Sequence, residues 1–195
     1  HNKLKDKIEA YMRDSANIIL ESIILSDNIE NVIDIIFNCI MKGKKIVLFG
    51  NGGSSADSQH IAAEFVGRFI LNRKSIAALS LTTDSSILTA ISNDFSSEDI
   101  FSRQCESLVS DGDVVIGIST SGNSNNVIKG LKKAKDNGAI TIGLLGNFGG
   151  KIKDIVDHAI IVHSTSTPKI QEVHRVISHI ICKLVEEKYF ERENE

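Results

Sequence analysis

The chain has 195 residues, which suits a single domain, since one domain commonly takes roughly 100 to 200 residues. Its 42% hydrophobic and 24% charged residues, with only one proline, are typical of a folded globular protein and exclude a disordered chain. The net charge of -3 supplies no overall positive field, so we expect neither a nucleic acid nor a membrane as partner.

Cysteine usage and hydropathy indicate a cytoplasmic protein. Cys39, Cys105 and Cys182 are widely spaced and form no CxxC pair, so we interpret them as reduced packing residues. No run approaches the roughly 18 apolar residues that span a bilayer, and no signal-peptide pattern opens the chain. The cytoplasm is therefore the expected location.

Two helices are predicted first, over roughly residues 3–25 and 28–42, because apolar side chains recur there at helical spacing. We expect them to pack as an N-terminal helical hairpin within residues 1–43, and any surplus apolar surface to favour contact with another subunit. The residues of the first helix expected to face the second are Ile8, Met12, Ile19 and Ile23.

The rest of the chain, residues 44–195, alternates short apolar runs with helical patterns. The runs are KIVLFG, SIAALSL, DVVIGIS, AITIGLLG and HAIIV. Parallel strands need crossover connections and are buried on both faces, so this alternation favours a five-stranded parallel sheet between helices. We predict an α/β fold, a three-layer αβα sandwich, in a single domain covering residues 1–195.

The first run is followed by a glycine-rich loop, residues 50–55, which leads into a helix. Glycines allow close backbone approach, and a helix start offers free N–H groups to an anion. The loop matches neither GxGxxG, which fails at Ser55, nor a Walker A loop. A simple turn into the helix is the alternative interpretation.

The third run is followed by a loop rich in hydroxyl groups, which also precedes a helix. Four hydroxyls and several N–H groups at a helix N-terminus suit a phosphate group. Helix capping alone is the alternative, although a cap needs one hydroxyl rather than four. The hydroxyl residues are Ser119, Thr120, Ser121 and Ser124.

The helix predicted over residues 54–70 carries a polar stripe opposite its apolar side. Asp57, His60, Glu64 and Arg68 fall within roughly 80° of each other at about 100° per residue. An i,i+4 pair of imidazole and carboxylate, His60 and Glu64, can bind one divalent metal ion. A solvent-facing stripe is the alternative, but the helix begins at the ligand edge of the sheet.

A C-terminal helix begins at Thr167 and Pro168, which give an N-cap and N1 signal. Gln171 and His179 lie off its apolar stripe but about 12 Å apart along the axis. Sharing one metal would require long converging side chains, an irregular first turn or ligands from different subunits. His174, at the edge of the stripe, is expected to have a packing or interface role.

Together, the segments GNGGSSADSQHIAAEF, LTTD, AISND, GISTSGNS and IQEVHRVISH resemble the phosphoheptose isomerases of the sugar isomerase (SIS) domain family, over residues 4–187. The resemblance implies a flavodoxin-like SIS fold and a homotetramer with active sites at subunit boundaries. It implies one zinc ion per subunit, bound by His60, Glu64, Gln171 and His179. The implied substrate contacts are Asn51, Gly52, Gly53, Glu64, Asn93, Asp94, Ser119, Thr120, Ser121, Ser124 and Gln171.

The implied activity is conversion of sedoheptulose 7-phosphate to D-glycero-D-manno-heptose 7-phosphate for bacterial surface heptose in lipopolysaccharide or capsule. We hypothesise an enediol mechanism in which Glu64 transfers the proton between carbons and His179 acts as acid and base at the oxygens. Some family members have a carboxylate where this chain has Pro168. Two alternatives stay open: a non-catalytic sugar-phosphate-binding SIS module, such as one that associates with the replication initiator DnaA, and an SIS isomerase of pentose or hexose phosphates.

Overall fold

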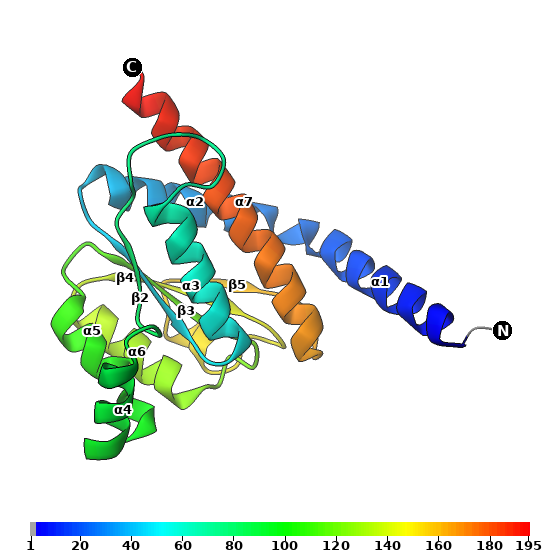
Figure 1. Cartoon of the computed structure of the whole chain (residues 1–195), viewed down its shortest axis with the longest axis horizontal. Coiled ribbons are helices and arrows are strands. Elements are labelled where there is room, and N and C mark those ends of the chain that lie inside the picture. Colours follow the sequence, from blue (N-terminus) through cyan, green and yellow to red (C-terminus); the bar gives the residue numbers. More distant parts are fainter. Residues whose placement is uncertain (1–2) are drawn as a thin grey trace.

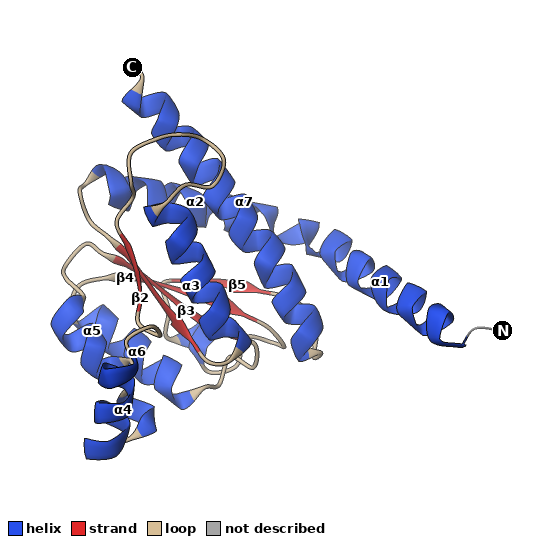
Figure 2. Cartoon of the chain, in the orientation of Figure 1, coloured by secondary structure: helices blue, strands red, loops and turns tan. Residues whose placement is uncertain are grey.

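A computed structural model describes residues 3–195 and contains one parallel sheet of five strands between two layers of helices (Figures 1 and 2). The strand order is β2-β1-β3-β4-β5, and every neighbouring pair is parallel. The predicted three-layer sandwich and its five strands are confirmed. The strands are β1 (Ile46–Gly50), β2 (Ala78–Ser80), β3 (Val114–Ser119), β4 (Ile140–Leu145) and β5 (His158–Ile161).

The central strands are buried on both faces, which explains why they appear in the sequence as continuous apolar runs. Alternate side chains of β1 enter two separate cores: Ile46 and Leu48 join one, and Val47 and Phe49 join the other. Each core is therefore the contact between one face of the sheet and one helical layer.

One face is covered by three helices, α2 (Ser26–Met41), α3 (Gly53–Val66) and α7 (Thr167–Glu193). The other is covered by α5 (Ser102–Leu108) and α6 (Asn125–Asp136), whereas α4 (Ser85–Asp94) lies at the periphery with only Ile91 buried. Short 3-10 turns complete the chain. They are η1 (Ser22–Leu25), η2 (Ser97–Asp99) and η3 (Ile152–Asp154).

The N-terminal helix α1 (Lys3–Glu21) does not pack against α2 as predicted. It projects from the body of the molecule and has no buried residue (Figure 1). Ile8, Met12 and Ile23 are 49%, 67% and 64% exposed, and only Ile19 of the predicted contact residues is partly buried against the core. The physical reason is η1, whose helical backbone carries the chain onward without a reversing turn. Residues 1 and 2 of the predicted hairpin lie outside the described residues.

Helix α1 is attached to the start of α7 by polar contacts instead. The Lys169 ammonium donates to the Ser15 hydroxyl at 2.6 Å and to the Tyr11 carbonyl at 3.0 Å. Glu172 accepts from Tyr11 and Ser15 at 2.8 and 2.6 Å. The exposed apolar side chains of α1 therefore stay free of the chain's own core.

Helix α7 continues to Glu193. The three cysteines are free and buried, which confirms their packing role. Across residues 3–195, none of the helices is both long and apolar enough to cross a membrane.

Candidate functional site

The glycine-rich loop lies where predicted, between the carboxyl end of β1 and the start of α3. A Cβ atom on Gly53 would stand 2.6 Å from the side-chain nitrogen of Gln171, which reaches this loop from the second turn of α7. Only glycine permits so close an approach. The structure therefore brings two of the expected substrate contacts together, one from each helix.

The hydroxyl-rich loop between β3 and α6 forms a compact turn. The Ser119 hydroxyl lies 3.1 Å from that of Ser124 and 3.4 Å from that of Ser121, and it accepts from the Gly122 N–H at 3.1 Å. Gly122 has a φ of 71°, and a Cβ there would meet the Gly149 carbonyl at 2.2 Å. Hydroxyl and backbone donors are thus concentrated at the start of α6, an arrangement suited to an anion.

The two loops are joined by a pair of amide side chains that sequence reasoning did not identify. Asn51 and Asn126 exchange two hydrogen bonds, of 2.8 and 2.9 Å. Because Asn51 belongs to the glycine-rich loop and Asn126 to the first turn of α6, this exchange joins the two loops. The two loops follow neighbouring strands, so the sequence predicts that they lie close together. It does not predict which side chains pair.

A hollow beside the glycine-rich loop adds another residue that the sequence did not single out. It is lined by Asn51, Gly52 and Ser55 together with Thr82, which follows β2. The Thr82 hydroxyl accepts from the Gln59 amide at 3.0 Å. The LTTD segment that contains Thr82 is the only sequence signal that could have pointed to it.

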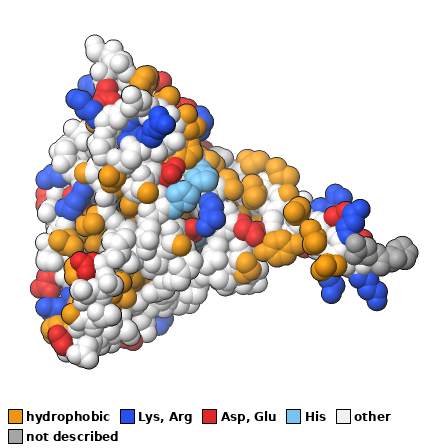
Figure 3. Space-filling view, in the orientation of Figure 1, with side chains coloured by type: hydrophobic (Ala, Val, Ile, Leu, Met, Phe, Trp, Pro, Cys, Tyr) orange, Lys and Arg blue, Asp and Glu red, His pale blue; other side chains and the backbone are white. Residues whose placement is uncertain are grey.

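The proposed catalytic side chains gather where α3 and α7 lie side by side (Figure 1). His60 Nε2 lies 3.4 Å from Glu64 Oε1, and the His60 and His179 rings meet edge to face with centroids 5.5 Å apart. All three line one narrow pocket of about 10 Å³, and histidines gather on this face of the molecule (Figure 3). The glutamate side chain is 21% exposed and His60 is 47% exposed, so solvent reaches the cluster.

The polar stripe of α3 is not a solvent-facing stripe throughout. Asp57 is only 3% exposed, and its Oδ1 accepts from Arg175 Nη2 at 3.1 Å. Its second oxygen has no hydrogen-bond partner among the described residues. Helix α7 covers this turn of α3, so the carboxylate belongs to the floor of the cavity.

His174 is fully buried, as the packing prediction required. Its Nε2 donates to the Leu145 carbonyl at 2.8 Å, at the carboxyl end of β4. Burial lowers the pKa of His174 to about 4, so the ring is neutral at pH 7.

The zinc prediction is supported by donor chemistry but not by the present arrangement of the side chains. Two imidazoles and a carboxylate are donors that zinc binds in proteins. In residues 3–195, however, no three His, Cys, Asp or Glu side chains are placed so that they could hold a metal ion. Gln171 lies at Gly53, about two turns of α7 from His179, so the expected fourth ligand is separate from the other three.

Asn93 and Asp94 lie at the exposed C-terminal end of α4. The Asn93 amide donates to the Asp94 carboxylate at 3.1 Å. Among the described residues, no hydrogen bond or ion pair connects these two side chains to either loop or to the His60 cluster. Their expected substrate contact stays a prediction.

Comparison with known proteins agrees with this arrangement of loops and helices. The SIS domain profile matches residues 10–146, so the chain belongs to the SIS domain family. It is 51% identical to a phosphoheptose isomerase of Aquifex aeolicus, covering 96% of this chain and 98% of that protein. It is 47% identical to one of Clostridium acetobutylicum, covering 96% and 97%. Within the SIS domain family, the chain belongs to the phosphoheptose isomerases.

Solved structures give the same result at the level of the fold. A phosphoheptose isomerase of Neisseria gonorrhoeae superposes with a TM-score of 0.90 at 38% identity, covering 95% of this chain and all of that one. One from Francisella tularensis superposes with a TM-score of 0.91 at 28% identity, covering 95% and 99%. The chain therefore has the fold of these two phosphoheptose isomerases.

Proposed function

We propose that the protein interconverts sedoheptulose 7-phosphate and D-glycero-D-manno-heptose 7-phosphate. The observation that carries the proposal is the meeting of His60, Glu64 and His179 in one cavity between α3 and α7. Relatives of about 50% identity are named phosphoheptose isomerases, which favours an enzyme over the non-catalytic alternative.

Moving a carbonyl from C2 to C1 requires a base for carbon and a proton carrier for oxygen. Glu64 takes a proton from C1 while a proton reaches O2, which gives an enediol. Loss of the O1 proton and return of a proton to C2 then complete the aldose. His179 serves the two oxygens, so protons move and no external oxidant or reductant is needed.

The phosphate group of the substrate serves as a remote anchor. The hydroxyls of Ser119, Ser121 and Ser124, together with the free N–H groups at the start of α6, supply donors for it. An anchor distant from the reacting carbons contributes binding energy without taking part in proton transfer. Asn51, through Asn126, fixes the glycine-rich loop beside this anchor.

Zinc is the proposed metal, with His60, Glu64 and His179 as three of its ligands and Gln171 as the fourth. When bound, it would supply a positive charge that polarises the substrate oxygens. The donor types of these side chains support this proposal. Metal analysis of the purified protein and of a His60→Ala variant tests it: we expect about one zinc per chain, lost in the variant.

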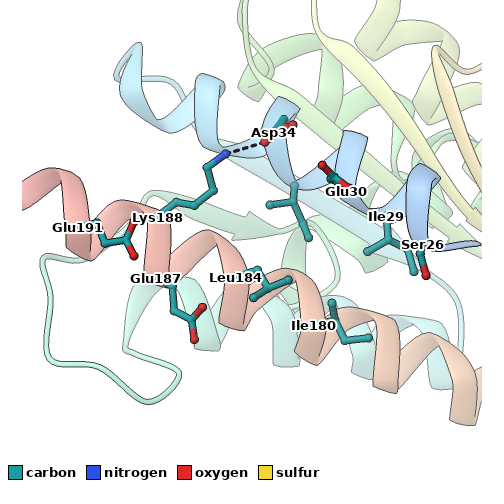
Figure 4. A pocket seen from close by; sticks show the side chains of 10 residues that line it. Ser26, Ile29, Glu30, Asp34, Ile180, Leu184, Glu187, Lys188 and Glu191 are labelled. Atoms are coloured by element: carbon teal, nitrogen blue, oxygen red, sulfur yellow. Dashed lines mark hydrogen bonds and ion pairs between the residues drawn. The ribbon is translucent and has the colours of Figure 1, made fainter. Parts of the chain in front are cut away.

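A homotetramer is the proposed assembly. Apolar side chains of the projecting α1 helix and of the η1 turn after it are exposed, including Met12 at 67% and Ile24 at 79% (Figure 3). A groove between α2 and α7 also has an apolar floor that includes Ile29, Ile180 and Leu184, with Lys188 and Asp34 paired at its rim (Figure 4). Association of copies through these surfaces would also offer a route by which one subunit completes another's site.

Light scattering, which measures the molar mass of the protein in solution, tests the number of chains in the assembly. We expect four chains for the wild-type protein and a smaller particle for Met12→Asp. The proposed cellular role is heptose synthesis for bacterial surface lipopolysaccharide or capsule, in the cytoplasm.

The activity is tested by incubating the purified protein with ketose phosphates of five, six and seven carbons and following aldose formation by NMR. We expect conversion of sedoheptulose 7-phosphate to exceed that of the shorter sugars. Faster turnover of a pentose or hexose phosphate would assign the chain to another isomerase, and no turnover of any sugar would contradict an enzymatic function.

A further inference from the structure

A buried carboxylate on α7 holds the segment that follows α3. The side chain of Glu186 is only 1% exposed. One of its oxygens accepts from the Phe69 N–H at 2.9 Å, and the other accepts from the N–H groups of Ile70 and Leu71 at 2.8 and 3.0 Å. Burial alone would raise the pKa of Glu186, but these three bonds and the adjacent Arg73 hold it below its usual value.

The partner of this carboxylate is Arg73, which is fully buried and donates from Nε to Glu186 at 2.9 Å. Its remaining donors bind carbonyls at the end of α3, at Gly67 just beyond it, and at the neighbouring Lys74. Nη2 reaches the Glu64 carbonyl at 2.8 Å, and Nη1 reaches those of Phe65, Gly67 and Lys74 at 2.7, 3.2 and 3.1 Å. The last carbonyls of a helix lack partners within it, so the guanidinium acts as a buried C-terminal cap.

Each half of the pair is one contact away from a proposed catalytic residue. Glu186 holds the backbone of Phe69, whose ring packs on the imidazole of His179 with centroids 5.6 Å apart. Arg73 holds the backbone carbonyl of Glu64. The pair therefore joins the two helices that carry the cluster, and it does so within two turns of His179.

We propose that the Arg73–Glu186 clamp, meaning these two side chains and their backbone contacts, positions Glu64 and His179 relative to each other for catalysis. The proposal rests on the proposed isomerase function. Neither side chain touches the substrate loops, so both are positioning residues. Misplacement of reacting groups by about 1 Å can lower a rate roughly 10²-fold, which makes such a clamp important for turnover.

A matched control exists elsewhere in the chain. Asp113 is another buried carboxylate in an ion pair, 2.7 Å from the Lys45 ammonium, and it accepts from the backbone N–H groups of Lys45 and Ser110. It precedes β3, so it lies at the amino edge of the sheet, opposite the loops of the site. Asp113→Asn therefore weakens a comparable network without reaching the cluster.

The test compares Glu186→Gln and Arg73→Lys with Asp113→Asn in kcat, KM and melting temperature. We expect both clamp variants to lower kcat roughly 10-fold or more. Their KM should stay near wild type because the phosphate anchor lies on other elements. The control should lower the melting temperature but keep the wild-type kcat. If Glu186→Gln fails to fold, Arg73→Lys, which keeps the positive charge, is compared with Asp113→Asn instead.

A spectroscopic readout separates the clamp from the proposed function. In protein with 13C-labelled histidine, we expect the ring signals of His60 and His179 to shift in both clamp variants and not in Asp113→Asn. An inactive wild-type enzyme would contradict the isomerase function. The ring signals would then still test whether the clamp positions the two histidines. Unchanged ring signals, or equal kcat losses in clamp and control variants, would overturn the positioning role.

Discussion

The imidazole rings of His60 and His179 meet edge to face, with centroids 5.5 Å apart, although one belongs to the first helix of the α/β core and the other to the last. The contact exists because α3 and α7 pack side by side on the same face of the sheet. The chemistry that we propose depends on this packing.

His179 is expected to be essential for turnover. Replacing it with glutamine removes the acid–base group at the substrate oxygens, so kcat should fall by roughly 10² to 10⁴. His163→Gln is the matched control, because this exposed histidine lies after β5 and outside the cluster. Steady-state rates of both variants check the prediction, and a similar kcat for the two would contradict it.

The hydroxyl loop is expected to control substrate affinity more than rate. Ser121→Ala with Ser124→Ala removes two donors to a charged phosphate, each worth about 1.5 to 3 kcal/mol. KM should therefore rise by roughly 10²-fold or more while kcat changes less. Ser107→Ala, on α5, serves as the control. An unchanged KM in the double variant would show that the phosphate binds elsewhere.

Gly53 is expected to be required for the position of Gln171. An alanine Cβ would stand 2.6 Å from the Gln171 amide and displace it, so Gly53→Ala should lower kcat/KM without destabilising the helix. A double-mutant cycle shows whether Gly53→Ala acts through Gln171. We expect Gly53→Ala to cause no further loss in a Gln171→Ala background, whereas additive losses would mean that the loop itself is distorted.

The free energy of unfolding is expected to decrease as the pH is lowered from 6.5 to 4, because of His174. Its folded pKa is about 4, against 6.5 for an unperturbed histidine, so in this range the unfolded chain binds a proton that the folded chain does not. The free energy of unfolding therefore rises with pH, by about 3 kcal/mol from pH 4 to pH 6.5. Asp157 and Glu186, whose pKa values are also lowered, contribute only at lower pH.

Urea unfolding at pH 7 and pH 5 measures this effect. We expect the free energy of unfolding of the wild-type protein to be about 2 kcal/mol lower at pH 5 than at pH 7, because in this interval the unfolded chain protonates His174 and the folded chain does not. His174→Gln keeps an N–H donor for the Leu145 carbonyl and does not titrate, so it should lose much less. Equal losses in both proteins would assign the effect to other groups.

The sequence predicted the five strands and both ligand loops, because parallel strands are buried on both faces and glycine or hydroxyl clusters stand out where they end. It did not predict that α1 would project away from α2, since helical periodicity shows which side of a helix is apolar but not what covers it. Burial of Asp57 was also missed, because the stripe that contains it continues into residues that are exposed.

The Arg73–Glu186 clamp was beyond sequence reasoning for a different reason. Its partners are mostly backbone N–H and carbonyl groups, and no side-chain pattern records which of these a distant helix will reach. The pairing of Asn51 with Asn126 is similar: neighbouring strands bring their loops together, but only the structure shows which amides meet.

The most direct test of the account is the rate at which Glu64→Gln converts sedoheptulose 7-phosphate, compared with wild type in the same NMR assay. The glutamine has the size and shape of the glutamate but cannot accept a proton from carbon. We predict that wild type forms the aldose, that the variant does so roughly 10² to 10⁴ times more slowly, and that both melt at the same temperature. A variant that isomerises the sugar at the wild-type rate would contradict the proposed site.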